Sequence, residues 1–248
     1  MRVMLDYLDT LARASTLEEV WDLHCETMAK FGFDRLIYGN TRFTTEDSLG
    51  VYDDAFFLSN HDPEYFNRFV REKMFLQAPM VRWARENVGA MSWGTLWADR
   101  EGLSREEREV IAFNLTMNVK AGYSIRFADP SPRSFALIAL AAERNKSQED
   151  ADAAWREFGR EIETMNHMLH LKIMSLPLRT SRASLSGRQR EVLEWVGEGK
   201  SHQDIATILG VTVPTVEKHL RLAREKLGVE TTAQAILKAA FQNQIYSL

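Results

Sequence analysis

The stretch from residue 185 to residue 227 constrains this chain most, because it places three short helical patterns within about forty residues. A short amphipathic segment ends at Gly210, and the next segment opens with Thr212 and Pro214. This order of helix, glycine turn and helix start is typical of a helix-turn-helix. The second helix of such a motif enters the major groove of DNA, so we expect this stretch to bind double-stranded DNA.

The rest of the chain has the composition of an ordinary globular protein. Its 248 residues, 45% hydrophobic and 27% charged, suffice for two domains with separate cores. Cys25 is the single cysteine, which excludes an internal disulfide and fits a reducing compartment. No apolar run reaches transmembrane length, and Asp6 and Asp9 interrupt the start of the chain, where a signal peptide would need its apolar core. We therefore expect a soluble cytoplasmic protein that does not enter a membrane.

The net charge of −4 is unevenly divided along the chain. Residues 1–170 carry 20 basic and 28 acidic side chains, whereas residues 185–248 carry 8 basic and 7 acidic ones. Residues 171–184 add three cations and no acid. Cations gather on or near the expected second helix of the motif, at Lys218, Arg221, Arg224 and Lys226. This modest basic footprint predicts that one copy binds DNA weakly.

Helical and strand-like patterns follow one another through the first 173 residues. Thr16 with Glu19, and Ser104 with Glu107, each have the spacing of a capping box at a helix start. Hairpin-like connections such as the turn at 129–132 cannot build parallel pairs, so we predict an α+β fold, an α/β/α sandwich on an antiparallel sheet. The expected helices are 3–11, 16–31, 63–74, 78–87, 104–118 and 147–173, and the expected strands are 33–43, 51–59, 122–127 and 134–141, with a short strand ending at Trp93.

A break in these patterns separates two expected domains. Residues 175–184 contain Pro177 and a polar run of serine, arginine and threonine, which favours a linker. We therefore divide the chain into a sensor domain at 1–173, a linker at 174–184 and an all-α helix-turn-helix domain of four helices at 185–248. Ser201 and Thr212 are the expected caps of its second and third helices. Four such helices leave too little interior for an active site.

An ordered series of residues carries a family resemblance in the last domain. The series is Leu185, Ser186, Arg188, Arg190–Leu193, Trp195, Gly199–Ser201, Ile205, Ala206, Leu209–Val211, Thr215, Val216, His219, Leu220 and Lys226–Val229. Over Leu185–Ile245 it resembles the DNA-binding domain of LuxR-type transcription regulators. Gln189 departs from the family pattern, which usually has an acidic residue there.

The resemblance implies that Thr215, Glu217, Lys218 and Arg221 face the DNA groove. Lysine and arginine can donate to guanine acceptors or to phosphates, whereas Glu217 either accepts from a cytosine amine or repels phosphate. We expect His219 to be a packing or phosphate-contact residue, because no second metal ligand lies at a suitable spacing on this helix. The full set of expected DNA contacts is Thr215, Val216, Glu217, Lys218, His219, Arg221, Arg224 and Lys200.

Pro79, Trp93 and Gly122, in their order among the expected helices and strands, carry a second and weaker resemblance. The first domain is similar to the autoinducer-binding domain of quorum-sensing LuxR-type proteins, which recognises acyl-homoserine lactones. This implies a pocket for a small apolar signal molecule, with no other cofactor. Plain core packing is the alternative for the aromatic members. The expected pocket residues are Tyr38, Tyr65, Phe69, Ala78, Pro79, Trp93, Phe113 and Ala139.

Several polar anchors of that family are altered in this sequence. An aspartate that accepts a hydrogen bond from the ligand amide is replaced by Ala78. The usual tryptophan and tyrosine positions fall on Tyr65 and Phe69, and a hydroxyl-bearing strand position falls on or near Ala139. Loss of a charge-assisted hydrogen bond of about 1.5–3 kcal/mol weakens a standard ligand by about one to two decades. The pocket is therefore tuned to another ligand, or the protein needs none.

The remaining candidate side chains have ordinary interpretations. Asp53 and Asp54 could accept hydrogen bonds from a ligand, although a solvated turn or edge is favoured. His167 and His170 could bind a metal together, but without a third ligand an exposed or dimer-facing pair is favoured, and we expect no metal site. Cys25 is interpreted as a small helical or core side chain rather than a reactive thiol.

These observations favour a homodimeric transcription regulator controlled by a small molecule. Two DNA half-sites joined by a protein interface raise affinity through effective concentration, which compensates for the modest basic footprint. The helix at 147–173 and the last helix are the expected interfaces. A ligand-independent regulator is the alternative. An enzyme fused to a DNA-binding tail is disfavoured because no nucleophile elbow, phosphate loop or paired metal motif occurs in the first 170 residues. A phosphorylation-controlled receiver is disfavoured by the order of strands and helices.

Overall fold

The computed structural model describes residues 2–41, 55–98, 102–128, 131, 134–176 and 184–246 of the chain. They belong to two compact units, Met1–His170 and Leu171–Leu248, and each unit has a hydrophobic core of its own. Asp53, Asp54 and most of the expected linker, residues 177–183, lie outside the described residues. None of the helices in the described ranges is both long and apolar enough to cross a bilayer.

A five-stranded antiparallel sheet forms the centre of the N-terminal unit. Its strand order is β2-β1-β5-β4-β3, so the central strand β5 pairs with β1 from a distant part of the sequence. The expected antiparallel sheet is thereby confirmed. The strands are β1 Phe33–Thr41, β2 Phe56–Ser59, β3 Gly89–Ser92, β4 Gly122–Arg126 and β5 Phe135–Ala142.

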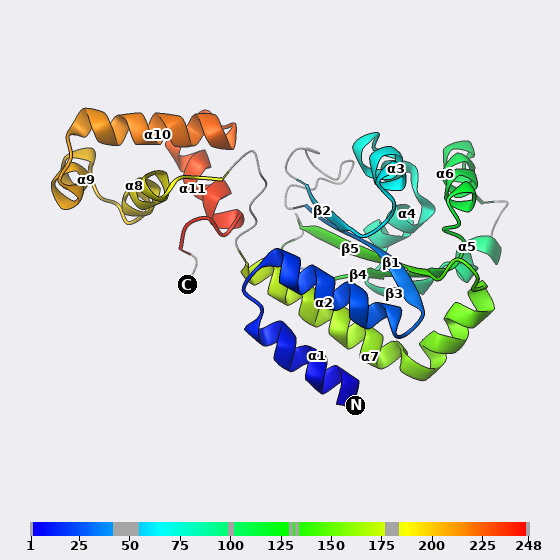
Figure 1. Ribbon diagram of the computed structural model, residues 1–248. Coiled ribbons are helices and arrows are strands. Elements are labelled where there is room, and N and C mark those ends of the chain that lie inside the picture. Colours follow the sequence, from blue (N-terminus) through cyan, green and yellow to red (C-terminus); the bar gives the residue numbers. More distant parts are fainter. Residues whose placement is uncertain are drawn as a thin grey trace. The chain divides into compact units, whose positions relative to one another are not determined.

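Helices cover both faces of this sheet, which confirms the α/β/α sandwich (Figure 1). One layer consists of α1 Arg2–Arg13, α2 Leu17–Ala29 and α7 Gln148–Ser175. The other layer consists of α3 Pro63–Phe66, the π-helical turn η2 Asn67–Arg71, the 3-10 turn η3 Met74–Gln77, α4 Pro79–Glu86, α5 Gly94–Ala98 and α6 Arg105–Thr116. Capping boxes start α2 at Thr16 and α6 at Ser104, as their spacing predicts.

A buried polar network joins the three helices on the first face. The Tyr7 hydroxyl donates to Nδ1 of His24 (2.9 Å), whose Nε2–H donates to Oδ1 of Asn166 (3.1 Å). On the same face of the sheet, the Tyr38 hydroxyl lies 2.8 Å from Nδ1 of His170 on α7. His170 also stacks on Phe127 at 4.4 Å. The expectation that His170 is exposed is therefore wrong, because its ring fills the space between α7 and the sheet.

The segment after Pro63 differs from the single helix expected over residues 63–74. The chain passes from α3 into η2, whose wider turn places Phe69 and Val70 together on the buried side. It then reverses at Lys73, which has a left-handed backbone (φ 62°). Backbone hydrogen bonds hold this corner: the Lys73 N–H donates to the Val70 carbonyl (3.0 Å), and the Leu76 N–H donates to the Lys73 carbonyl (3.1 Å). The break brings η3 back over the sheet.

The C-terminal unit consists of four short helices around a small apolar core. Side chains from all four helices meet there, including Val192, Ile205, Val216 and Ala235. The helices are α8 Gly187–Gly197, α9 His202–Leu209, α10 Val213–Leu227 and α11 Thr232–Phe241. Gln189 closes a capping box with Ser186, so the departure from an acidic residue keeps the helix start, since glutamine suits that position as well as glutamate does.

The turn between α9 and α10 depends on a glycine. Gly210 ends α9 in the left-handed conformation (φ 63°), where a side chain would be strained. Thr212 occupies the cap position of α10, but its hydroxyl bonds that of Thr215 (2.9 Å) rather than a backbone N–H. The expected side-chain cap is therefore absent, and Pro214 in the first turn reduces the need for it because proline carries no N–H.

Candidate functional sites

The outer face of α10 is the candidate DNA interface. Val216, Leu220, Ala223 and Leu227 point into the core. Residues on the opposite side of a helix at this spacing face solvent, and Glu217, Lys218, Arg221 and Glu225 are all exposed. The prediction that Val216 contacts DNA is wrong, because Val216 is 0% exposed.

The other predicted DNA contacts lie around this face with different degrees of exposure. Lys200 is exposed between α8 and α9, whereas Thr215 and His219 are half-buried. Arg224 is also half-buried, and its guanidinium donates to the Thr232 hydroxyl at the start of α11 (3.1 Å). The Arg224 side chain is thus tied to the neighbouring helix.

One exposed ion pair and one exposed histidine–carboxylate contact involve charged side chains of this face. Arg221 Nη1 lies 2.6 Å from the Glu225 carboxylate one turn away. Nδ1 of His202 on α9 lies 3.9 Å from the Glu217 carboxylate. Exposed pairs of this kind contribute only about 0.2–1 kcal/mol, so a DNA phosphate or base can replace either partner at small cost.

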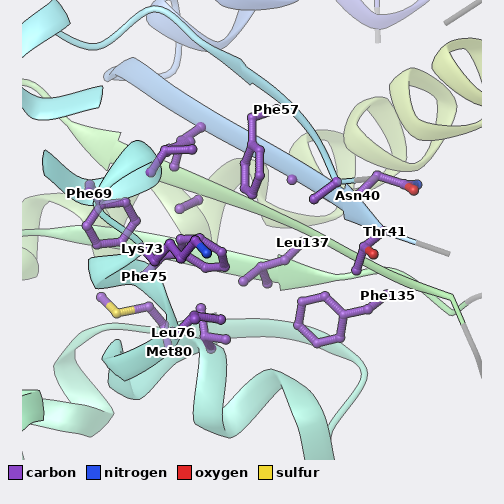
Figure 2. Close-up of a pocket in the computed structure, with 16 residues that line it drawn as sticks. Asn40, Thr41, Phe57, Phe69, Lys73, Phe75, Leu76, Met80, Phe135 and Leu137 are labelled. Carbon is purple, nitrogen blue, oxygen red and sulfur yellow. The ribbon is translucent and has the colours of Figure 1, made fainter. Parts of the chain in front are cut away.

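A cavity of about 160 Å³ lies in the N-terminal unit between the sheet and the η2–α4 segment. Its floor is made by the facing residues of β1 and β5, where Ile37 pairs with Ala139 and Gly39 with Leu137. Figure 2 shows the side chains that surround it. The lining residues are Ile37, Gly39, Asn40, Thr41, Ala55, Phe57, Phe69, Val70, Lys73, Phe75, Leu76, Met80, Val81, Phe135, Leu137 and Ala139.

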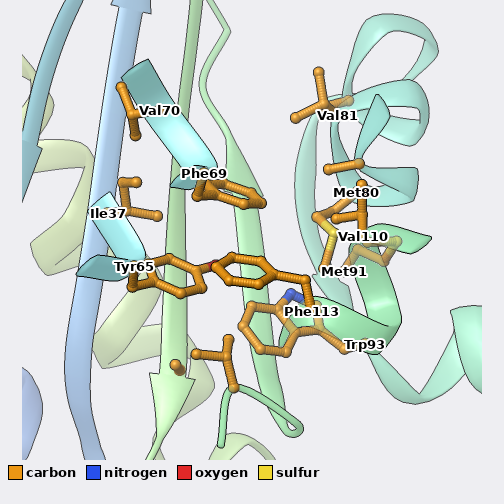
Figure 3. Packing of buried hydrophobic residues seen from close by; sticks show 14 of the residues in the cluster. Ile37, Tyr65, Phe69, Val70, Met80, Val81, Met91, Trp93, Val110 and Phe113 are labelled. Carbon is orange, nitrogen blue, oxygen red and sulfur yellow. The ribbon is translucent and has the colours of Figure 1, made fainter. Parts of the chain in front are cut away.

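Two of the eight predicted pocket residues, Phe69 and Ala139, line this cavity. Tyr65, Ala78, Trp93 and Phe113 belong to the hydrophobic cluster that shares Phe69, Met80 and Val81 with it (Figure 3). Pro79 is buried at the start of α4. Tyr38 points to the opposite face of the sheet, toward α7, so its assignment to the pocket is wrong.

Aromatic stacking fills the interior beside the cavity. The Tyr65 ring stacks between Phe69 and Phe113, with centroid distances of 5.1 and 5.5 Å. Figure 3 shows these rings with Trp93 next to Phe113. Ala78 caps α4 without a side-chain hydrogen bond and is 1% exposed, so this position supplies no acceptor for a ligand amide.

The polar atoms of these aromatic residues bond within the protein. The Tyr65 hydroxyl donates to Asn114 Oδ1 (3.1 Å), and burial raises the pKa of Tyr65 above its usual range. The Trp93 indole N–H donates to the Ser124 hydroxyl (2.9 Å). Ser124 lies opposite Ala139 in the sheet, so a hydroxyl is present one strand away from the expected position.

Sequence reasoning missed Asn114 and Ser124, together with the polar cavity residues Asn40, Thr41 and Lys73. Ser124 had a local signal, because it is a polar residue at an inward position of a strand whose neighbours are apolar. Lys73 had none, since the left-handed corner that carries it interrupts a pattern that reads as one helix.

Glycine at position 122 is explained by a close approach. A Cβ there would collide with the Leu140 carbonyl oxygen and lie 3.0 Å from the Trp93 ring. The backbone of β4 thus passes directly against Trp93.

Together, an apolar cavity in one unit and an exposed basic helix of a helix-turn-helix in the other define the class of DNA-binding sensor proteins.

Comparison with known families shows which family within this class the chain belongs to. Residues 16–173 match the autoinducer binding domain, and residues 183–239 match the family described as bacterial regulatory proteins, luxR family. The chain therefore belongs to the LuxR-type transcription regulators that carry an autoinducer-binding domain. These families and the relatives below are regulators of transcription rather than enzymes.

Relatives and solved structures agree with this assignment. The transcriptional activator AnoR of Acinetobacter nosocomialis is 21% identical over 94% of this chain and 95% of its own length. BjaR1 of Bradyrhizobium diazoefficiens is 23% identical over 96% and 94%. Escherichia coli SdiA has the same fold, with a TM-score of 0.53 and 16% identity over 97% of both chains. The N-acylhomoserine lactone dependent CepR2 of Burkholderia cenocepacia has a TM-score of 0.55 and 18% identity over 70% of this chain and 94% of its own.

Proposed function

We propose that this chain is a homodimeric transcription regulator whose DNA affinity changes when a small, largely apolar molecule occupies the cavity beside η2 and η3. The observation that carries this proposal is the cavity itself, because its floor and walls are mostly aliphatic and aromatic side chains of the autoinducer-binding domain. Acyl-homoserine lactones are the first ligands to test, and no other cofactor is required. As a regulator of promoter DNA, the protein would act in the cytoplasm.

Exposed apolar side chains support dimerisation through the two helices expected to form interfaces. Met168 and Leu171 on α7 are 38% and 60% exposed, and Leu237 on α11 is 52% exposed. Burying such residues against a second copy removes apolar surface from water and brings two recognition helices to one operator.

Two measurements test this function. Sedimentation of the full chain at micromolar concentration is expected to give a dimer with or without promoter DNA, and Leu171→Glu is expected to weaken it. Thermal unfolding and promoter binding are then compared across acyl-homoserine lactones of varied chain length. A monomer under all conditions would contradict the dimer, and a flat response across the panel would contradict lactone recognition.

A ligand-independent regulator is the second candidate. The observation that favours it is that the Tyr65 hydroxyl and the Trp93 indole already donate to Asn114 and Ser124, so neither donor needs a ligand to be satisfied. This candidate predicts full promoter affinity in protein that mass spectrometry shows to carry no bound small molecule.

A further inference from the structure

The outer face of α10 carries an acidic side chain in line with its cations. Lys218, Arg221 and Glu225 are exposed, and their spacing of three, four and seven residues places them in one row on the side of the helix opposite the core. Attraction to phosphates favours only basic residues in a row that faces DNA. The carboxylate of Glu225 therefore needs another explanation.

The stability of the helix does not supply that explanation. Glu225 lies in the last turn of α10, between Arg224 and Lys226, where the negative end of the helix dipole disfavours a carboxylate. Its pair with Arg221 also has the weaker order, because a carboxylate one turn before a cation stabilises a helix more than one that follows it. A residue that breaks two local preferences on a binding face points to a role in function.

Glu225 contacts one particular part of the Arg221 guanidinium. Nη1 of Arg221 donates to Oε1 of Glu225 at 2.6 Å, and both side chains are more than half exposed. In the part of the chain that the structure describes, this is the hydrogen bond that the guanidinium makes, so the edge formed by Nε and Nη2 stays open. The parallel donors of that edge match the O6 and N7 acceptors that guanine presents in the major groove.

Arg221 is the arginine of α10 that can present this edge to DNA. Arg224 is half-buried and bonds Thr232 on α11, whereas Arg221 is exposed in the outer row. An untethered arginine side chain samples many rotamers, so a contact at one corner of the guanidinium lowers the entropy that is lost when the opposite edge binds a base. The charge of Glu225 also repels phosphates, which lowers the affinity for DNA of any sequence.

We propose, resting on the function proposed above, that Glu225 is a positioning residue that holds Arg221 to read a guanine in each half-site of the operator. Glu225 thereby raises the discrimination between DNA sequences and lowers the affinity for DNA in general. These two effects have opposite signs, so a residue that merely supported the fold would not produce both.

Selection from a random pool of duplex DNA identifies the base pair that Arg221 reads. The full chain is used, with and without the panel of acyl-homoserine lactones, and the bound duplexes are sequenced. Guanine is expected at one position of each half-site, and Arg221→Ala is expected to lose the preference at that position while the other preferred positions remain.

Glu225→Gln then tests the positioning role. Fluorescence anisotropy compares the selected duplex with one in which that guanine of one half-site is replaced by adenine, and the unsubstituted protein is expected to discriminate about 5- to 150-fold. Glu225→Gln is expected to lower this ratio about two- to fivefold, in keeping with the small contribution of an exposed pair. The same variant is expected to bind DNA of unrelated sequence more tightly, because a negative charge is removed from the face.

Glu109→Gln is the matched control. Arg105 and Glu109 on α6 form an exposed pair with the same spacing and order, at 3.0 Å, in the N-terminal unit. The control removes the same charge from the full chain and breaks the same kind of pair, and it is expected to change neither the discrimination nor the affinity for unrelated DNA.

The outcomes separate this inference from the proposed function. Unchanged discrimination in Glu225→Gln, or an equal change in its affinities for selected and unrelated DNA, overturns the positioning role. An Arg221→Ala variant that keeps every preferred position overturns the reading of guanine. Identical selections with and without the lactones contradict lactone control and leave the inference in place. If the full chain enriches no sequence under any condition, the inference and the regulatory function are both wrong.

Discussion

Lys218, Arg221 and Val216 lie within two turns of α10, but they have opposite roles. Lys218 and Arg221 are exposed on the face away from the core, whereas Val216 is fully buried. Position in the sequence alone does not separate these residues, because all three are expected DNA contacts on α10. The angular position of each residue around the packed helix does separate them.

Removal of Lys218 or Arg221 is expected to weaken promoter binding. Lys218→Ala and Arg221→Ala each lose a contact of about 1–3 kcal/mol, which corresponds to about 5- to 150-fold in the dissociation constant. Fluorescence anisotropy with labelled promoter DNA measures this loss. Lys226→Ala, an exposed lysine in the last turn of the same helix, is the matched control and is expected to change the affinity less than about twofold.

Val216→Ala supplies the complementary control. It removes two buried methyl groups and is expected to lower the free energy of unfolding of the C-terminal unit by about 2 kcal/mol. The DNA affinity of the folded protein should stay within about twofold. An affinity loss as large as that of Lys218→Ala, in protein shown to be folded, would contradict the assignment of Val216 to the core.

At the scale of elements, the helices on the α7 face are tied together by the network through His24. Burial lowers the pKa of His24 to about 4, although its hydrogen bond to Asn166 opposes the shift. The neutral ring is therefore part of the folded structure. The same network explains why α1, which has no partner strand, stays attached to α2 and α7.

This pKa predicts a loss of stability in acid. The unfolded histidine has a pKa of 6.5, so between pH 6.5 and pH 4 the unfolded chain binds more protons than the folded one. Stability is full above about pH 6.5 and falls below it, by about 2 kcal/mol from His24 between pH 7.5 and pH 5. Urea unfolding across this range measures the effect.

His24→Gln is expected to remove that part of the pH dependence, because glutamine does not titrate. Burial and Arg35 lower the pKa of His61 to about 3, so His61 also makes stability fall in acid. The stability of His24→Gln is therefore expected to depend on pH, but less than that of the unsubstituted protein. His219→Gln, in the C-terminal unit, is the matched control. An unchanged pH profile in His24→Gln would show that His24 is not the buried neutral group.

At the scale of the whole molecule, the net charge of −4 is a poor guide to DNA binding. The acidic excess belongs to the N-terminal unit, and the cations that matter lie around one helix of the other unit. For the dimer proposed above, two half-sites are expected to determine both the affinity and its salt dependence.

The salt dependence of promoter binding is expected to report the number of bound protomers. If Lys200, Lys218, Arg221 and Arg224 each neutralise one phosphate, a dimer makes about eight contacts and a plot of log affinity against log salt has a slope of about −7. A single protomer would give about −3.6 by the same rule. Titrations of the full chain between about 50 and 200 mM salt distinguish the two values. A slope near the single-protomer value of about −3.6 would contradict binding as a dimer.

The amino-acid sequence by itself determined most of the helix starts, the antiparallel class of the sheet and the helix-turn-helix tail. These features depend on interactions between residues three or four apart, such as the capping boxes at Thr16 and Ser104, or on short ordered motifs such as the turn at Gly210. Their physical causes are local, so a single sequence displays them.

Only the tertiary structure decided where the cavity lies and which residues line it. Its floor depends on the register that pairs Ile37 with Ala139, about a hundred residues apart in a chain whose strand order cannot be read from periodicity. Tyr38 was assigned to the wrong face for this reason, and Lys73 was missed because its corner arises from packing rather than from a turn signal. Long-range pairing and close packing, which no local pattern encodes, therefore determine what this sensor can bind.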